Sequence, residues 1–385
     1  MSGRLLRLVC TAAVAAGIVC APVSAAADPA PGPGDTRSVV GLLTDLQRLY
    51  REAEKATETY NGTEERLKRQ RAEVRRLDAE LARTRASLHD SRGAAGRLAR
   101  QQYQSSGNLS PYLRLLLARD PQHAIDQGHV IGRLARERVE TVGRLTGAEK
   151  KAADLARRSR QALDRQVALA ESQAEQRDDV RERLRAVEEL LASLTPEQLA
   201  ALAELEESGI ARKQERFLAS GALGDDAKPS AEGERAVRFA VEQLGKPYEW
   251  GAEGPASYDC SGLTSVAWQR AGTAIPRTSQ EQWARLERVP LNELRPGDLV
   301  VYFPEATHVA MYLGDGKVVQ APRPGAEVKV SPIAANPVLG AVRPDPGGEP
   351  LRRYTPPRLP EGATDGSDEG YADAYAPAAP ETSIR

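Results

Sequence analysis

The sequence predicts an α+β protein in which a long helical hairpin precedes a compact mixed domain. Residues 38–220 are rich in Ala, Leu, Glu, Arg and Gln, which favour helix, and their apolar residues recur at heptad spacing. All three tryptophans lie instead between residues 231 and 345, among short β-rich runs. The low overall aromatic content of 4% therefore reflects dilution of one compact domain by the helical segment.

Length and charge limit the classes of protein that fit. A chain of 385 residues predicts two or three structural units. Its 53 Lys and Arg residues balance 54 Asp and Glu residues, so the net charge of −1 gives no basic surplus and argues against nucleic acid as a partner. Three cysteines are too few for a disulfide framework.

Residues 1–27 have the layout of a secretory signal peptide. Two arginines precede an apolar run from Leu8 to Val23, and the small residues Ala25–Ala27 follow. We expect cleavage near residue 27, which would place the mature protein outside the cell. The alternatives are a transmembrane anchor and a lipid anchor on Cys20. Cleavage would leave Cys260 as the one cysteine of the mature chain.

After a Pro- and Gly-rich linker at residues 28–37, residues 38–220 predict an α-helical coiled-coil hairpin. Two sets of apolar residues have the required spacing: Leu67, Val74, Leu81 and Leu88, and then Val180, Leu184, Val187, Leu191 and Leu194. The alternative is single exposed helices with many salt bridges.

A turn cluster at Ser105–Asn108 divides the hairpin, so we expect two antiparallel arms joined by a tip near residues 106–128. The tip contains the apolar run Leu113–Leu117. This run is either a docking surface or a cluster that packs on itself.

Residues 221–230 form a second linker, and residues 231–345 predict the compact domain. The Pro-, Gly- and acid-rich residues 346–385 lack periodicity and predict a disordered tail. Within the domain, Cys260 is the only cysteine and His308 the only histidine. One Cys and one His cannot form a metal-ligand cluster, and no phosphate-binding loop is present, so we expect neither metal nor cofactor.

Cys260 is predicted to begin a helix. Leu263, Val266 and Ala267 follow it at helical spacing, and Gly272 suits the helix end. At a helix N-terminus the helix dipole and a histidinium partner would lower the thiol pKa and favour the nucleophilic thiolate. The alternative role is that of a small buried apolar thiol.

His308 and Gln320 are expected on the two strands of a β-hairpin. The β-rich run from residue 308 to 313 is followed by Gly314-Asp315-Gly316 and then by a second β-rich run from residue 317 to 321. Pairing of the runs would bring His308 and Gln320 together, although the spacing leaves the register open. A polar partner would fix the tautomer and orientation of the imidazole.

Five ordered motifs in this domain resemble the NlpC/P60 family of bacterial cell-wall cysteine peptidases. The resemblance covers roughly residues 234–342. The motifs are Pro247-Tyr248-Glu249-Trp250-Gly251-Ala252, Asp259-Cys260-Ser261-Gly262-Leu263, Ile275-Pro276-Arg277-Thr278, Pro296-Gly297-Asp298-Leu299, and the stretch from His308-Val309-Ala310 to Gly314-Asp315-Gly316.

The resemblance implies a papain-like fold with Cys260 as nucleophile and His308 as general base. Gln320 falls at a third position where His or Glu is common in the family, and a neutral amide stabilises imidazolium less than a carboxylate does. Tyr248 matches a family tyrosine near the oxyanion, or else packs in the core. Asp259 and Ser261 flank the nucleophile and are expected to shape the pocket.

The implied reaction is hydrolysis of the γ-D-glutamyl–diamino acid bond in peptidoglycan stem peptides, which would take place in the cell wall. The helical hairpin is expected to act in regulation or targeting: either it covers the active site, or it docks through the apolar tip Leu113–Leu117 to a membrane-bound regulator of division or wall synthesis. Two alternatives remain at this stage. One is an N-acetylmuramoyl-L-alanine amidase on the same scaffold. The other is a weakly active or non-catalytic cell-wall scaffold protein, which the glutamine at position 320 and the long hairpin keep open.

Overall fold

The computed structural model describes residues 38–105, 113, 120–224, 227–366 and 368. The predicted signal peptide and first linker, and most of the predicted tip, lie outside the described residues. The described residues from Val39 onward belong to one unit. Within the described part of the chain, no helix is both long and apolar enough to cross a membrane.

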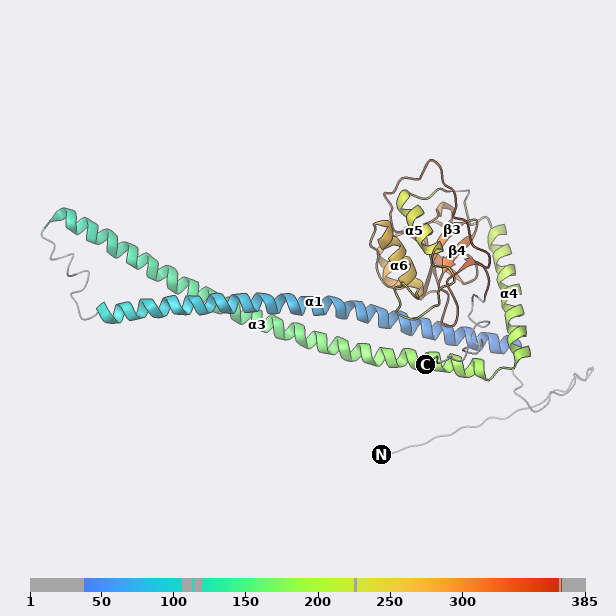
Figure 1. Cartoon of the computed structure of the whole chain (residues 1–385), viewed down its shortest axis with the longest axis horizontal. Helices are drawn as coiled ribbons and strands as arrows, with labels where there is room; N and C mark the ends of the chain where they lie inside the picture. The colour runs from blue at the N-terminus through green and yellow to red at the C-terminus, as the bar shows by residue number, and fades with distance from the viewer. Residues whose placement is uncertain (1–37, 106–112, 114–119, 225–226, 367, 369–385) are drawn as a thin grey trace, which may run out of the picture. The chain divides into compact units, whose positions relative to one another are not determined.

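Helices α1 (Val39–Ser105) and α3 (Pro121–Ala192) pair as an antiparallel hairpin (Figure 1). Two ion pairs between them establish the direction. The pair of Arg183 with Glu52 measures 2.5 Å, and that of Arg92 with Glu149 measures 3.2 Å. As the residue number rises along α1 its partner's number falls along α3, which is the pattern of two antiparallel arms.

Apolar side chains at the predicted heptad positions lie between the two arms. The buried members of the predicted seam are Leu67, Leu81, Val180, Val187 and Leu191. A polar side chain in the seam also has a hydrogen-bond partner: Gln70 Nε2 donates to the Ala162 carbonyl at 2.8 Å. Burial of these apolar faces stabilises helices that would be marginal as isolated helices.

The helical region ends in a separate helix, α4 (Pro196–Ala219), rather than in a continuation of the second arm. α3 ends at Ala192, and Thr195 caps α4 through a capping box with Gln198. Gln214 of α4 then donates to the carbonyl of Gly316 at 2.9 Å. α4 is therefore attached to the compact domain.

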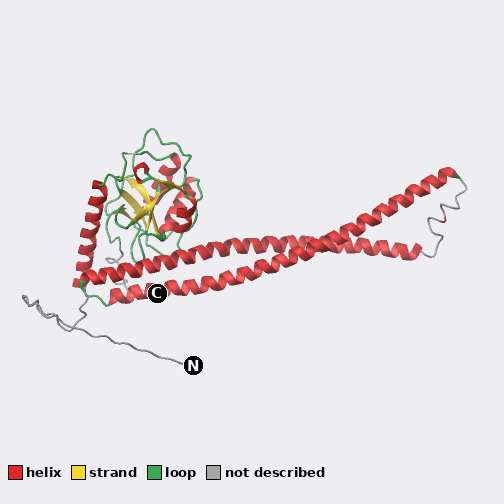
Figure 2. Cartoon of the chain, turned by 180° about the vertical axis from the view of Figure 1, so that it is seen from behind, coloured by secondary structure: helices red, strands yellow, loops and turns green. Residues whose placement is uncertain are grey.

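The compact domain combines three helices with one antiparallel sheet (Figure 2). Its elements are α5 (Ala231–Val241), α6 (Cys260–Ala271), α7 (Ser279–Arg285), β1 (Glu287–Val289), the 3-10 turn η1 (Leu291–Glu293), β2 (Leu299–Tyr302), β3 (His308–Gly314), β4 (Lys317–Gln320), β5 (Lys329–Pro332) and β6 (Val338–Arg343). The strand order is β1-β6-β2-β3-β4-β5, and each neighbouring pair is antiparallel. The predicted α+β fold, with a papain-like domain after the helical hairpin, is confirmed.

The sheet is buried on both faces. One face packs against α5 and α6 through a core that includes Leu263, Trp268, Leu299, Val309 and Met311. The other face carries Val300, Tyr302, Ala310, Tyr312 and Val318, and Phe217 of α4 packs against it. Because successive strand residues face opposite sides, this double cover explains why β2 is apolar at every position instead of alternating.

The region predicted as a disordered tail, residues 346–385, contacts the domain over its described part. The Leu351 N–H donates to the Pro229 carbonyl at 2.9 Å, and the Val330 N–H of β5 donates to the Ala363 carbonyl at 2.7 Å. These backbone hydrogen bonds join the described part of the segment to the residue before the α5 cap and to the edge strand β5. Residues 367 and 369–385 lie outside the described part.

Candidate active site

Cys260 is the first residue of α6, and Asp259 is the cap of that helix. Asp259 Oδ1 accepts the Gly262 N–H at 2.6 Å, while Oδ2 accepts the Gly251 N–H at 2.9 Å. A Cβ on Gly262 would lie 2.1 Å from the carbonyl oxygen of Ala252. The Asp-Cys-Ser-Gly motif therefore has a mechanical basis: the acid caps the helix, and the glycine permits close approach of the preceding loop.

Arg277 neutralises the buried carboxylate that caps α6. Its Nη1 and Nη2 atoms donate to the two oxygens of Asp259 at 3.0 and 2.6 Å, and Nη1 also donates to Ser261 Oγ at 2.8 Å. Asp259 is 0% exposed and Arg277 is 8% exposed. The planar guanidinium thus ties both residues that flank Cys260 to the loop before α7.

His308 begins β3, and the pairing of β3 with β4 brings it to Gln320 as expected. His308 Nε2 lies 2.7 Å from Gln320 Oε1. The ring centroids of Tyr302 and His308 are 5.7 Å apart. Burial lowers the pKa of His308 to about 4; the hydrogen bond to Gln320 opposes this shift, and Arg323 adds to it. A neutral His308 whose Nε2–H donates to Gln320 leaves Nδ1 as the basic atom.

Tyr248, the expected oxyanion residue, lies close to the thiol. Burial raises the pKa of its hydroxyl well above the usual range, and the charges of Cys260 and Asp259 add to this effect. The Cys260 sulfur is in turn close to the Val309 N–H, the residue after His308. The structure therefore gathers the sequence-predicted residues Cys260, His308, Gln320, Tyr248, Asp259 and Ser261 in one site.

Three polar side chains of α1 enter the same site. Glu58 Oε1 lies 3.8 Å from Cys260 Sγ and accepts the Ser261 hydroxyl at 2.8 Å. Its Oε2 atom accepts the Ser279 N–H at 2.8 Å. Asn61 Nδ2 donates to Asp259 Oδ2 at 3.0 Å. Glu58 is thus held beside Cys260 by hydrogen bonds from two residues of the compact domain, Ser261 and Ser279.

Glu54, one helical turn before Glu58, lies at the histidine. Its Oε1 atom is 3.7 Å from His308 Nδ1, and its side chain is 3% exposed. Further along α1, Tyr60 packs edge-on against Trp250 with ring centroids 4.9 Å apart. The segment of α1 from Glu54 to Asn61 consequently covers the cysteine and the histidine together.

This cover sets the chemical state of the thiol. Burial raises the pKa of Cys260 well above its usual range, and the carboxylates of Glu58, Asp259 and Glu54 add to the shift, while the Val309 N–H opposes it. The expectation of a lowered thiol pKa is therefore wrong for this arrangement, because burial and nearby carboxylates outweigh the helix N-terminus. The thiol is neutral at physiological pH.

The sequence analysis did not identify the site residues of α1. It also did not identify the roles of Arg277 and Ser279. A signal for α1 was present: Glu54, Glu58 and Asn61 share one helical face, and the small residues Ala53, Ala56 and Thr57 beside them interrupt the apolar seam. Small residues permit close approach of another surface. Arg277 lies within the motif Ile275-Pro276-Arg277-Thr278, but its sequence separation from Asp259 does not predict that the two side chains are in contact.

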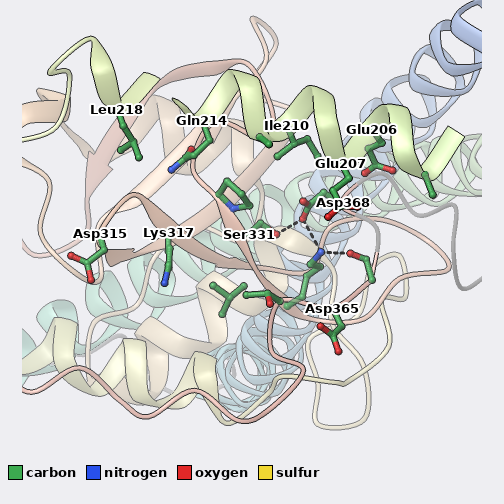
Figure 3. A pocket seen from close by; sticks show the side chains of 17 residues that line it. Glu206, Glu207, Ile210, Gln214, Leu218, Asp315, Lys317, Ser331, Asp365 and Asp368 are labelled. Carbon is green, nitrogen blue, oxygen red and sulfur yellow. Dashed lines mark hydrogen bonds and ion pairs between the residues drawn. The ribbon is translucent and has the colours of Figure 1, made fainter. Parts of the chain in front are cut away.

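One cavity lies away from Cys260. It measures about 750 Å³ and lies between α4 and the β4–β5 edge, as Figure 3 shows for Glu207, Gln214, Ser331 and Asp368. Among the described residues, no group of three or more His, Cys, Asp and Glu side chains is placed to hold a metal ion.

A cysteine that begins a helix, packed on an antiparallel sheet that carries a histidine and its polar partner, defines a papain-like cysteine peptidase domain. The profile of the NlpC/P60 family matches residues 245–340. The chain belongs to the NlpC/P60 family through this domain.

Relatives resemble either most of the chain or the domain alone. A probable endopeptidase of Mycobacterium tuberculosis is 29% identical over 350 residues, which is 78% of this chain and 89% of that protein. Peptidoglycan endopeptidase RipA of Mycolicibacterium smegmatis is 37% identical over 114 residues, 26% of this chain and 23% of RipA. The solved structure of RipD of M. tuberculosis, described as a non-catalytic NlpC/p60 domain protein, is 31% identical with a TM-score of 0.27, covering 29% of this chain and 96% of that one.

Proposed function

We propose that this protein is a secreted peptidoglycan endopeptidase that cleaves the γ-D-glutamyl–diamino acid bond of stem peptides. The observation that carries the proposal is that Cys260 and His308 lie under the same segment of α1, with Gln320 at hydrogen-bond distance from His308, in a domain of this family. The endopeptidase names of relatives that match most of the chain, or its domain, support the same substrate class.

The proposed chemistry uses a thiolate and an imidazolium. His308 Nδ1 takes the Cys260 proton, and the sulfur attacks the scissile carbonyl carbon to form a tetrahedral intermediate. The Cys260 N–H and the Tyr248 hydroxyl donate to the oxyanion. His308 then protonates the leaving amine, a thioester forms, and water deprotonated by His308 hydrolyses it.

The same proposal assigns a regulatory role to α1. While Glu58 is bound to Ser261 and Ser279, a peptide cannot reach the sulfur, and the neighbouring carboxylates keep the thiol protonated. Displacement of α1 would admit water and substrate, and it would take the carboxyl groups of Glu54 and Glu58 away from the thiol. Both changes favour the thiolate.

Digestion of purified cell walls tests the proposal. We expect the full chain to release fragments slowly, a Glu58→Arg variant to release the same fragments at least about tenfold faster, and Cys260→Ala to release none. Arginine at position 58 loses two accepted hydrogen bonds and faces the guanidinium of Arg277. Glu73→Arg is the matched control, because Glu73 is on α1 but pairs within that helix.

Mass spectrometry of the fragments separates the rival functions. A new amino terminus on the diamino acid supports the endopeptidase, whereas a new amino terminus on L-alanine would show an amidase. Unchanged cleavage by Cys260→Ala would contradict the thiol mechanism. Wall binding without cleavage by the wild type and the Glu58→Arg variant would show a non-catalytic scaffold protein.

A further inference from the structure

The hydrogen bond between His308 and Gln320 continues into a longer chain of polar groups. Gln320 Nε2 donates to Ser331 Oγ at 2.8 Å, and the Ser331 hydroxyl donates to Asp368 Oδ1. Gln320 and Ser331 are each 1% exposed, and Asp368 is 8% exposed. Figure 3 shows Ser331 and Asp368 joined at the wall of the cavity beside α4.

The chemistry of its last member gives this chain a direction. An ionised carboxylate only accepts hydrogen bonds, so Ser331 must donate its one proton to Asp368. The hydroxyl then offers its lone pairs to Gln320, which turns its amide nitrogen toward Ser331 and its oxygen toward His308. Because Gln320 Oε1 can only accept a hydrogen bond, the proton of the neutral His308 ring must be on Nε2. His308 Nδ1 is then unprotonated and can take the thiol proton.

Asp368 is held at the end of this chain by separate contacts. Lys329 Nζ lies 3.2 Å from Asp368 Oδ1 and donates to the Gly366 carbonyl. Arg323 Nε donates to the backbone carbonyl of Asp368 at 3.2 Å. Asp368 also lies beyond residues 245–340, the part of the chain that matches the family profile. A segment outside the matched domain thus supplies an anchored carboxylate.

We propose that Ser331 and Asp368 are positioning residues that set the tautomer of His308 through Gln320. The C-terminal segment is then part of the catalytic apparatus, although neither residue contacts substrate. A glutamine can serve at the third position because its otherwise ambiguous amide is oriented by a carboxylate two hydrogen bonds away. This inference rests on the thiol mechanism proposed above.

The tautomer can be measured directly in the full chain. With 15N-labelled histidine, ring nitrogen shifts report which nitrogen carries the proton, and His308→Gln assigns the signal among the four histidines. At neutral pH we expect Nε2 to be protonated in the wild type and both tautomers to be populated in Ser331→Ala and Asp368→Ala. Ser331→Thr keeps the hydroxyl and should restore the wild-type spectrum. Asp365→Ala, an exposed change in the same segment, is the control.

Activity provides a second readout, measured in full chains that also carry Glu58→Arg. Ser331→Ala and Asp368→Ala should lower kcat by roughly 10- to 100-fold and change the pH profile, with KM nearly constant, because the substrate contacts remain. Wild-type tautomer and pH profile in both variants would overturn the inference and leave the proposed function intact. An equal effect of Asp365→Ala would also overturn it. Full activity in Cys260→Ala would instead contradict the proposed function.

Discussion

Glu58 brings a carboxylate from the middle of a long helix to within 3.8 Å of the Cys260 sulfur. The position is costly for a charge, since burial raises the pKa of Glu58 to about 7 and the nearby Asp259 adds to the shift. Arg277, the Ser261 hydroxyl and the Ser279 N–H oppose it. One residue therefore both fills the space beside the nucleophile and links the closed state to the proton concentration.

The pH dependence of opening follows from Glu58. When α1 is released, we expect the Glu58 pKa to return from about 7 toward the ordinary value of 4.5. Between pH 4.5 and about pH 7, Glu58 keeps its proton only in the closed state. Closure is therefore most favourable at the acidic end of this range. It weakens as pH rises through this window, by up to roughly 3 kcal/mol, and is constant above it.

A Glu58→Gln variant isolates this effect. Glutamine does not titrate, whereas the lowered pKa of His308 and the charges of Glu54, Asp259 and Arg277 are common to both proteins. The ratio of Cys260 alkylation rates, wild type over Glu58→Gln, should rise at least about tenfold from about pH 5 to about pH 8. A ratio that is constant with pH would contradict the assignment.

At the scale of elements, α6 depends on its contact with the loop before it. Gly262 has no room for a side chain, because a Cβ would meet the Ala252 carbonyl oxygen at 2.1 Å and Asp259 Oδ1 at 2.9 Å. Gly262→Ala must push this loop away and weaken the cap on the catalytic helix. We expect a loss of roughly 2–3 kcal/mol in unfolding free energy, measured by urea denaturation.

Gly209→Ala in α4 is the matched comparison. A Cβ there meets nothing within 4 Å, so the substitution should stabilise the helix by about 0.5–1 kcal/mol. Equal effects of the two substitutions would show that the close approach at Gly262 is not what requires glycine.

The elements differ in how well the sequence predicts them. The arms of the hairpin follow from heptad spacing, and the α6 start follows from Asp259 and the apolar positions after Cys260. The separate helix α4 was not predicted, because the Thr195–Pro196 start signal lies inside a long helix-forming composition. The packing of α4 on the sheet was not predicted either, because it depends on Phe217, which the sequence does not distinguish from other apolar helix residues.

At the scale of the whole molecule, the site could be predicted where residue chemistry is rare or where a residue stands in a recognisable motif. Cys260 and His308 stood out because the domain has one of each. Glu58 did not, because an acidic residue in a charged helix usually faces water, and no local pattern shows contact across 202 residues. Asp368 was likewise hidden in an acidic, aperiodic segment whose contacts exist only once the sheet has formed.

Closure by α1 is the central claim, and the rate of Cys260 alkylation by iodoacetamide tests it most directly. Peptide mass spectrometry separates Cys260 from the cysteines at positions 10 and 20. At neutral pH we predict that Cys260 in the full chain reacts at least about tenfold more slowly than in Glu58→Arg, with Glu73→Arg matching the wild type. Equal rates in the wild type and Glu58→Arg would contradict a thiol that α1 keeps covered and protonated.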